Sequence, residues 1–326
     1  MNLCPAILLI SILGAWAAAE VTVIVRKDAK GAGTRIFFQD GEEIARSADA
    51  AFRAADPEGR PLGRLEGHVP TGEVREYHPN GRLKTLFRAI NEADGTLSTC
   101  ILEEYRPNGK MAFKAERDGC ASRLVIEFHP SGLPKIIANW AHGTPEGPST
   151  HYYDDTRGRK RVMMETFYRG GLRDGVERMY YRDGSLWSEG RYKEDKREGK
   201  EVAYNDDGDG GRTEREYRAD EQVGFERSYD KRGKLYSEIP YAGGQRDGTW
   251  KVFSSGGVAL LYEIVFKKGK LDGESRSYDE NGKGLLRCIL TYRDGTLVKR
   301  QAFDGAGTPL PGKDRAYCSS LERYPK

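Results

Sequence analysis

One short segment of this chain places side-chain oxygens at the spacing of a calcium-binding loop. Counted from Asn205, oxygen-bearing side chains recur at Asp207, Asp209 and Glu216. These correspond to positions 1, 3, 5 and 12 of an EF-hand loop, and glycine occupies position 6. The first position carries Asn where Asp is usual, and strand-like sequence flanks the segment where helices are expected. The two interpretations are a weak calcium site and a lengthened hairpin turn, and we favour the turn.

Other residue types that perform catalysis or bind phosphate are scattered along the chain. No Ser-His-Asp arrangement, His-x3-His pair or phosphate-binding loop is present in the sequence. The histidines stand apart from one another: His68, His78, His129, His142 and His151. Paired acidic residues fall on strand positions that face solvent, so a hydrolase of the glycosidase type is the weakest interpretation. The sequence therefore predicts binding rather than catalysis, with no catalytic residue and no small-molecule cofactor.

Four of the five cysteines follow the N-terminal apolar segment: Cys100, Cys120, Cys288 and Cys318. Zinc binding is not indicated, because no two of them lie two to four residues apart. An even number of cysteines in an exported chain favours disulfides. We predict the bridges Cys100–Cys120 and Cys288–Cys318, and buried free thiols are the alternative.

Residues 1–19 have the features of a signal peptide. An apolar run at 6–13, too short to span a bilayer, is followed by small residues at 15–19. We expect cleavage near Ala19 and export to the periplasm or the extracellular space. An uncleaved N-terminal anchor is the alternative.

The composition suits a thin repeat array better than a single globule. Hydrophobic residues make up 37% of the chain and charged residues 32%, and there are 40 glycines. A globule of this length normally has a larger aliphatic core. The net charge is +3, with acidic and basic residues mixed along the chain, so neither nucleic acid nor an anionic membrane is indicated as a partner.

An aromatic residue with glycine four positions later recurs about every 25 residues. These residues, called here the landmark aromatics, are Tyr77, Tyr105, Phe128, Tyr152, Tyr180, Tyr204, Tyr229, Phe253, Tyr278 and Phe303. Tyr152 is the exception, because its glycine follows later, at Gly158. A fixed period of this length indicates one small supersecondary unit stacked many times, which presents a long surface for binding.

The intervals within each unit predict a β-hairpin. Residues before the landmark alternate in character, a turn sequence such as Asn-Gly follows, and the next stretch alternates again as a returning strand. A second aromatic lies seven residues before the glycine that opens the next unit; these second aromatics are Tyr168, Tyr192, Tyr217, Tyr241 and Phe266. We predict an all-β fold, an elongated antiparallel meander of about ten stacked hairpins, whose landmark aromatics form a buried core ladder. An exposed aromatic row for glycan stacking is the alternative, with Trp187 and Trp250 as its candidates.

The repeat array is predicted to cover residues 65–310. Residues 20–64 are predicted to be an N-terminal cap that covers the open edge of the stack, or a degenerate repeat. Within them, 42–55 fits an amphipathic helix or a degenerate repeat. Residues 311–326 are predicted to be a short polar tail, which a bridge to Cys318 would hold against the array.

The Gly…Tyr…Asn-Gly…Tyr…Asp-Gly pattern resembles the MORN repeat variant, which many bacterial proteins carry in tandem. The segments at 72–83 and 247–258 match it best. Ten copies in register make the resemblance specific, although 85–100 and 154–168 are irregular. Some bacterial members are labelled toxin–antitoxin partners, and eukaryotic members are linked to membrane apposition and scaffolding. The resemblance thus implies a binding scaffold and supplies no catalytic motif.

Taken together, these features predict an exported, non-catalytic repeat scaffold whose partner is another protein. The contact would lie along a face of the meander or at an exposed edge by strand addition. An immunity or antitoxin role is the specific form that the resemblance implies. A structural envelope protein that contacts glycan or lipid is the first alternative, and a hydrolase is the second.

Overall fold

The computed structural model of the chain describes residues 20–27, 33–48, 61–64, 66–91, 96–118, 121–155, 157–205, 210–279, 281, 283–312 and 314–323. These residues form 28 strands and the helix α1 (Asp314–Arg323), so the all-β prediction is confirmed. The chain divides into two compact units, Met1–Ser122 and Arg123–Lys326. The predicted signal peptide at residues 1–19 lies outside the described residues. Within the described part of the chain, no helix combines the length and the apolarity needed to cross a membrane.

The first unit is a sheet with one parallel pairing. Its strands are β1 (Val21–Lys27), β2 (Gly33–Gln39), β3 (Glu42–Ala48), β4 (Pro61–Arg64), β5 (Glu66–Gly67), β6 (Gly72–Tyr77), β7 (Leu83–Asn91), β8 (Thr96–Tyr105) and β9 (Met111–Asp118). Strand β1 runs antiparallel to β2 and parallel to β6. The buried core includes Val23, Phe37, Val74 and Phe87. A buried ion pair, Arg35 Nη1 to Glu76 Oε2 at 3.1 Å, joins β2 to β6.

The helix considered for residues 42–55 is wrong where the structure describes them. Residues 42–48 are strand β3, and 49–55 lie outside the described residues. A turn at Asp40 and Gly41, both with positive φ, connects β2 directly to β3 and favours a hairpin. Within this hairpin Ala45 pairs with Phe37, and both side chains are buried. The degenerate-repeat alternative is therefore the better description of β3.

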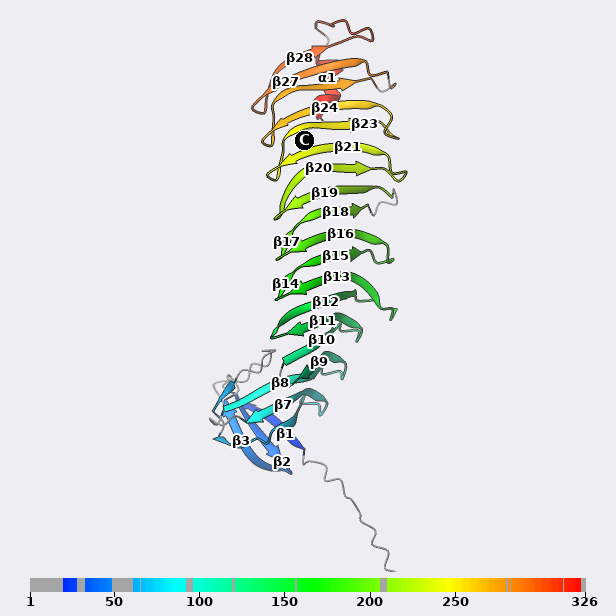
Figure 1. Cartoon of the computed structure of the whole chain (residues 1–326). Helices are drawn as coiled ribbons and strands as arrows, with labels where there is room; N and C mark the ends of the chain where they lie inside the picture. The colour runs from blue at the N-terminus through cyan, green and yellow to red at the C-terminus, as the bar shows by residue number, and fades with distance from the viewer. Residues whose placement is uncertain are drawn as a thin grey trace, which may run out of the picture. The chain divides into compact units, whose positions relative to one another are not determined.

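The second unit is an antiparallel meander in which each long strand pairs with the next long strand along the chain, and each two-residue strand pairs with the long strand before it (Figure 1). Its strands are β10 (Ala121–Phe128, which begins at the unit boundary), β11 (Pro134–Ala141), β12 (Thr144–Tyr153), β13 (Arg161–Arg169), β14 (Leu172–Arg173), β15 (Gly175–Tyr180), β16 (Leu186–Lys193), β17 (Lys196–Arg197), β18 (Gly199–Tyr204), β19 (Arg212–Arg218), β20 (Glu221–Tyr229), β21 (Leu235–Ala242), β22 (Gln245–Arg246), β23 (Gly248–Phe253), β24 (Leu260–Lys267), β25 (Lys270–Leu271), β26 (Gly273–Tyr278), β27 (Leu286–Arg293) and β28 (Thr296–Ala302). The stacked hairpins predicted from the repeat are thus confirmed for this unit.

Two-residue turns connect successive hairpins at one end of the strands. Both turn residues have positive φ, the geometry of a type I′ turn; the pairs are 142–143, 170–171, 194–195, 219–220, 243–244, 268–269 and 294–295. The second turn residue also donates its backbone N–H to a carbonyl one repeat earlier. Asp195 N donates to Arg173 O at 2.9 Å, and Asp220 N donates to Arg197 O at 3.0 Å. The turns from 170–171 to 294–295 are therefore docked on the repeat before them.

A β-bulge lies opposite the landmark aromatic in most hairpins. Tyr180 pairs with Leu186, whereas the residue before Tyr180 pairs with Ser188. The same register shift occurs at Tyr152, Tyr229, Phe253 and Tyr278. Tyr204 is an exception, because it pairs with Arg212 without a shift. A bulge increases the local twist and bends its strand, so most hairpins bend at the same place.

The helix α1 closes the C-terminal end of the second unit. It packs against β27 and β28, and the predicted Cys288–Cys318 bridge, with a sequence separation of 30, ties it to β27. The cluster between this helix and the sheet comprises Ile264, Phe266, Cys288, Leu290 and Tyr292 from the strands and Cys318 and Leu321 from the helix. Arg300 Nε also meets Glu322 Oε1 at 2.6 Å. The predicted tail at 311–326 therefore contains a helix that covers apolar side chains.

Candidate binding face of the second unit

The two faces of the sheet in the second unit carry different residues, because successive side chains of a strand point to opposite faces. One face, called here the packed face, carries the second aromatics and most of the buried side chains. Its buried residues include Tyr217, Ile239, Val252, Ile264, Phe266 and Leu290. The opposite face, called here the open face, carries the landmark aromatics. The packed face stabilises the array, which leaves the open face for binding.

On the packed face, arginine side chains lie between successive second aromatics. Tyr168 is the cross-strand partner of Arg173, and Arg173 Cζ lies 3.9 Å from the centroid of the Tyr192 ring. Tyr192 in turn pairs with Arg197, whose Cζ lies 4.0 Å from the centroid of the Tyr217 ring. Cation–π contacts of this kind contribute about 0.5–2 kcal/mol each, depending on their exposure. Rings and guanidinium groups thus alternate from repeat to repeat and join the repeats together.

On the open face, acidic and basic side chains alternate from strand to strand. Glu165 is the cross-strand partner of Arg178, which is the partner of Glu189. Beyond Val202, the row continues through Glu214, Arg227, Glu238, Lys251, Glu263 and Arg276. Arg178 Nε lies 2.7 Å from Glu189 Oε2, and Arg227 Nε lies 2.7 Å from Glu238 Oε2. Because exposed pairs contribute only about 0–1 kcal/mol each, this charge row fixes strand register more than it adds stability.

The landmark aromatics lie two residues from the charge row, and the prediction that all of them form a buried core is wrong. Tyr152 is buried, but the exposed fractions of Tyr77 and Tyr204 are 41% and 36%. The other seven are half-buried. The landmarks stand at strand ends, next to the hairpin turns, where fewer side chains surround them. The second aromatics of the packed face take the place that was predicted for the landmarks.

Tyrosine hydroxyls join several landmarks to the glutamates of the charge row. Tyr180 Oη donates to Glu165 Oε2 at 2.8 Å, and Tyr278 Oη donates to Glu263 Oε2 at 2.7 Å. Burial and this hydrogen bond raise the pKa of Tyr278 to about 12. The same two causes raise the pKa of Tyr180. The rings of Tyr180 and Tyr278 are therefore held in fixed positions while part of each ring stays accessible.

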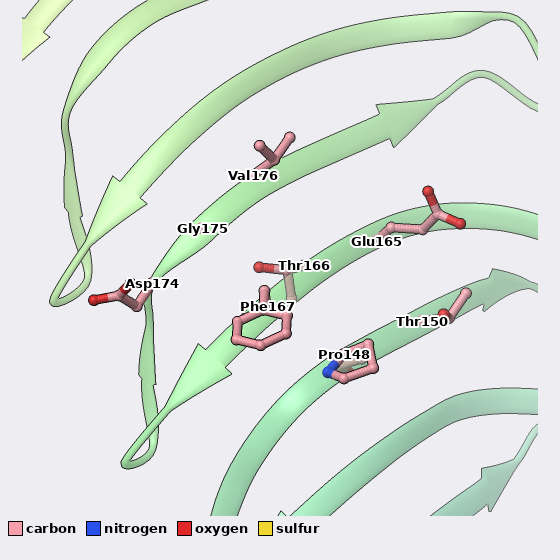
Figure 2. Close-up of a pocket in the computed structure, with 9 residues that line it drawn as sticks. Pro148, Thr150, Glu165, Thr166, Phe167, Asp174, Gly175 and Val176 are labelled. Atoms are coloured by element: carbon pink, nitrogen blue, oxygen red, sulfur yellow. The ribbon is translucent and has the colours of Figure 1, made fainter.

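A groove of about 420 Å³ opens on the open face across β12, β13 and β15. Its lining includes Pro148, Thr150, Glu165, Phe167 and Val176. Figure 2 shows Pro148 and Phe167 on neighbouring strands, with Thr150 and Glu165 farther along the same two strands. Phe167 pairs with Pro148 across the strands, and its exposed fraction is 39%. The groove thus has apolar walls and two carboxylates, Glu165 and Asp174.

Glycine at position 175 keeps this groove open. A Cβ at Gly175 would lie 3.0 Å from the Cβ of Phe167, closer than side chains normally approach. The arrangement recurs three repeats later, where Phe225 pairs with Pro240 and has an exposed fraction of 42%. There a Cβ at Gly248 would lie 2.9 Å from Pro240 Cγ. Two phenylalanines are therefore exposed on one face, each with a proline across the strands.

The calcium-loop candidates are only partly covered by the structure. Asp207 and Asp209 lie outside the described residues. Asn205 N donates to Gly211 O at 2.9 Å and closes the turn between β18 and β19, and Glu216 is exposed within β19. In the part of the chain that the structure describes, no three His, Cys, Asp or Glu residues are grouped to hold a metal ion.

The two tryptophan candidates differ in exposure, and two of the histidines contact the backbone of a neighbouring repeat. Trp187 has an exposed fraction of 44%, whereas Trp250 is half-buried and donates from Nε1 to Ser237 Oγ at 2.8 Å. His78 lies in a landmark turn, with its Nε2 2.8 Å from Tyr105 O. His129 makes the equivalent contact with Tyr152 O at 2.9 Å. Both histidines thus join neighbouring repeats, as their position in the repeat indicates.

The first predicted disulfide is described at one end only. Cys100 is fully buried and disulfide-bonded, and Cys120 lies outside the described residues.

Sequence reasoning missed the charge row, although its signal was present. A basic residue stands two positions before four of the landmarks of the second unit: Arg178, Arg227, Lys251 and Arg276.

Three stretches of the chain match the family model described as MORN repeat variant: residues 70–87, 173–194 and 271–288. No curated protein matches the chain. Among solved structures, a mutated Photorhabdus luminescens Tc holotoxin pore is similar at 11% identity over 88% of this chain and 17% of that chain, with a TM-score of 0.15. A crystal structure of a eukaryotic initiation factor is similar at 12% identity over 88% of this chain and 84% of that chain, with a TM-score of 0.20. Neither likeness supports an argument at these TM-scores. The three matched stretches coincide with strands and turns of the repeat, so this chain carries MORN repeat variants.

Proposed function

We propose that the protein is an exported, non-catalytic scaffold that binds another protein through the open face of its second unit. The observation that carries this proposal is the pair of exposed phenylalanines, Phe167 and Phe225, each with a proline across the strands and a hollow or glycine beside it. Exposed aromatic residues in such settings are typical of interaction sites. A repeat array provides an extended surface for this purpose.

The electrostatics of the open face support a protein partner. Arg178 and Arg227 are each paired with a glutamate of the neighbouring strand. A protein that covers the phenylalanines therefore buries charges that already have partners, which avoids the large cost of an unpaired buried charge. Aromatic residues with a polar surround are also the usual composition of protein interfaces.

Export is supported by the Cys288–Cys318 disulfide, because disulfides form and persist in oxidising compartments. We therefore propose the periplasm or the extracellular space as its location. An immunity or antitoxin role is the narrower form of the proposal. It is tested by co-expressing the protein with the product of an adjacent gene and measuring whether toxicity is suppressed.

A structural envelope protein that contacts glycan is the second candidate, and the exposure of Trp187 favours it. An indole ring that is open to solvent can stack on a sugar ring. In that case the protein would sediment with insoluble cell-wall glycan, and Trp187→Ala would abolish the effect. A protein-binding scaffold stays in the supernatant in the same assay.

The main test is affinity capture followed by direct binding. Residues 20–326 are immobilised, proteins from the cell envelope are captured and identified, and the purified partner is titrated against variants. We expect Phe167→Ala and Phe225→Ala each to weaken binding about tenfold or more, as hot-spot aromatics do. The control is Val298→Ala, because Val298 is exposed on β28, away from the groove. Equal binding by all four proteins would contradict the proposal.

A further inference from the structure

The landmark aromatics form a second feature of the open face, with a regular spacing. Tyr180, Tyr204 and Tyr229 end β15, β18 and β20, and one long strand lies between each landmark and the next. Neighbouring strands are about 4.7–4.9 Å apart. The rings are therefore repeated about every 9.4–9.8 Å across the strands.

This spacing matches one class of peptide. A polyproline II helix has three residues per turn and a rise of about 3.1 Å per residue, so every third side chain projects in the same direction about every 9.3 Å. A β-strand does not match, because its same-face side chains recur about every 6.8 Å. Aromatic-lined surfaces are also the usual receptors of proline-rich peptides.

The groups beside the tyrosine row fit the backbone of such a peptide. A polyproline II chain has no internal hydrogen bonds, so its carbonyls need donors, and proline has no N–H that needs an acceptor. Arg178 and Arg227 stand two residues before Tyr180 and Tyr229 on the same face. Their guanidinium groups have more N–H donors than one glutamate accepts.

We infer that the partner of the open face presents a proline-rich segment with proline at every third position, which lies across the strands along Tyr180, Tyr204 and Tyr229. This inference rests on the proposed protein-binding function and specifies the chemistry of the partner. One proline ring packs on the exposed Tyr204, and the other two pack on the accessible parts of Tyr180 and of Tyr229, whose ring has Arg212 Cζ 4.2 Å from its centroid. The carbonyls between the prolines accept hydrogen bonds from Arg178 and Arg227. The rigid conformation of the peptide reduces the entropy lost on binding.

The test uses a capped nonapeptide with proline at positions 1, 4 and 7 and alanine elsewhere, titrated against residues 20–326. Its comparison is a peptide of the same composition with proline at positions 1, 3 and 7. We expect the first peptide to bind at least tenfold more tightly. Tyr204→Ala should weaken its binding at least fivefold, whereas Tyr204→Phe, which keeps the ring, should bind as the unchanged protein does.

Two measurements separate the loss of a ring contact from the loss of folding. Tyr204 is exposed, so the thermal unfolding of Tyr204→Ala should confirm that this variant folds. Tyr77→Ala is the matched control, because Tyr77 is an exposed landmark of the first unit, and its binding should be unchanged. Equal affinity for the two peptides, or no effect of Tyr204→Ala, would overturn the inference.

The outcomes also separate this inference from the proposed function. A captured partner that is lost with Phe167→Ala but contains no proline-rich segment would overturn the inference and leave protein binding standing. A dimer in sedimentation that Tyr204→Ala dissociates would show that a second copy of this chain occupies the row, which also overturns the inference.

Discussion

Single residues in the two-residue turns differ in how well they suit a left-handed backbone. Ala219 has a φ of 50°, where glycine is usual. An L-residue in this region costs roughly 1–2 kcal/mol. We expect Ala219→Gly to raise the free energy of unfolding by about 1 kcal/mol, after allowance for the greater flexibility of glycine in the unfolded chain. Urea unfolding followed by circular dichroism measures this change.

The matched control is the turn at Gly243, where φ is 55° and an added Cβ would meet nothing within 4 Å. Gly243→Ala changes backbone preference without a steric clash, so it should lower the free energy of unfolding by about 1 kcal/mol. Shifts of the same sign for the two substitutions would contradict the role assigned to backbone strain.

Tyr278 makes the stability of the folded protein sensitive to alkaline pH. Its pKa is raised to about 12 by burial and by the hydrogen bond to Glu263, whereas an unfolded tyrosine has a pKa of about 10. Its stabilising contribution is therefore complete below about pH 10 and is lost as the pH rises towards 12, because the unfolded chain ionises first. Difference absorbance titration of wild type and Tyr278→Phe measures this ionisation. Glu263→Gln should lower the pKa of Tyr278, and an unchanged titration would contradict the assigned contact.

For the aromatic residues, the positions in the repeat were easier to predict than the burial of each side chain. The landmarks follow from their spacing, but Tyr204 is exposed and Phe266 is buried. Tyr204 follows Val202 and Ala203, and Phe266 follows Ile264 and Val265, so apolar side chains point to both faces and a period of two does not say which face is packed. Which face is packed depends on the arginines that lie between the second aromatics, because these arginines contact the rings only once the hairpins stack.

The hairpin is the element on which most of the fold depends, and its last copy is reinforced covalently. The Cys288–Cys318 bridge closes a loop with a sequence separation of 30, which in the chain-entropy model stabilises the folded state by about 3–4 kcal/mol. We expect Cys288→Ser with Cys318→Ser to lower the free energy of unfolding by that amount. Calorimetry with and without reductant provides the measurement, and a reductant-insensitive wild type would contradict the prediction.

Glycine-rich turns made the hairpins predictable, but two local features were not. The turns at 194–195 and 219–220 contain no glycine, so their positive φ has no sequence signal. The bulges opposite the landmarks add one residue to the returning strand, and this addition changes the face of every residue after it. The helix α1 was missed because the tail was judged by its polarity, although two of its own residues, Cys318 and Leu321, are buried.

At the scale of the whole molecule, the proposed export makes a direct prediction about the mature chain. Removal of residues 1–19 should leave Glu20 as the first residue. Edman sequencing or intact-mass measurement of the protein from the cell envelope checks this, with Ala17→Leu and Ala19→Leu as the control that should block cleavage. An uncleaved chain that remains with the membrane would instead support the N-terminal anchor.

The docking of these two-residue turns on the repeats before them has a consequence for how the protein is made. The Gly269 N–H bonds to Arg246 O, and the Gly295 N–H bonds to Leu271 O, so every acceptor precedes its donor in the chain. A hairpin that has just formed thus already holds the acceptor that the next hairpin needs. The second unit can grow in the direction of synthesis by short-range steps, and assembly at no stage waits for a distant segment of the sequence.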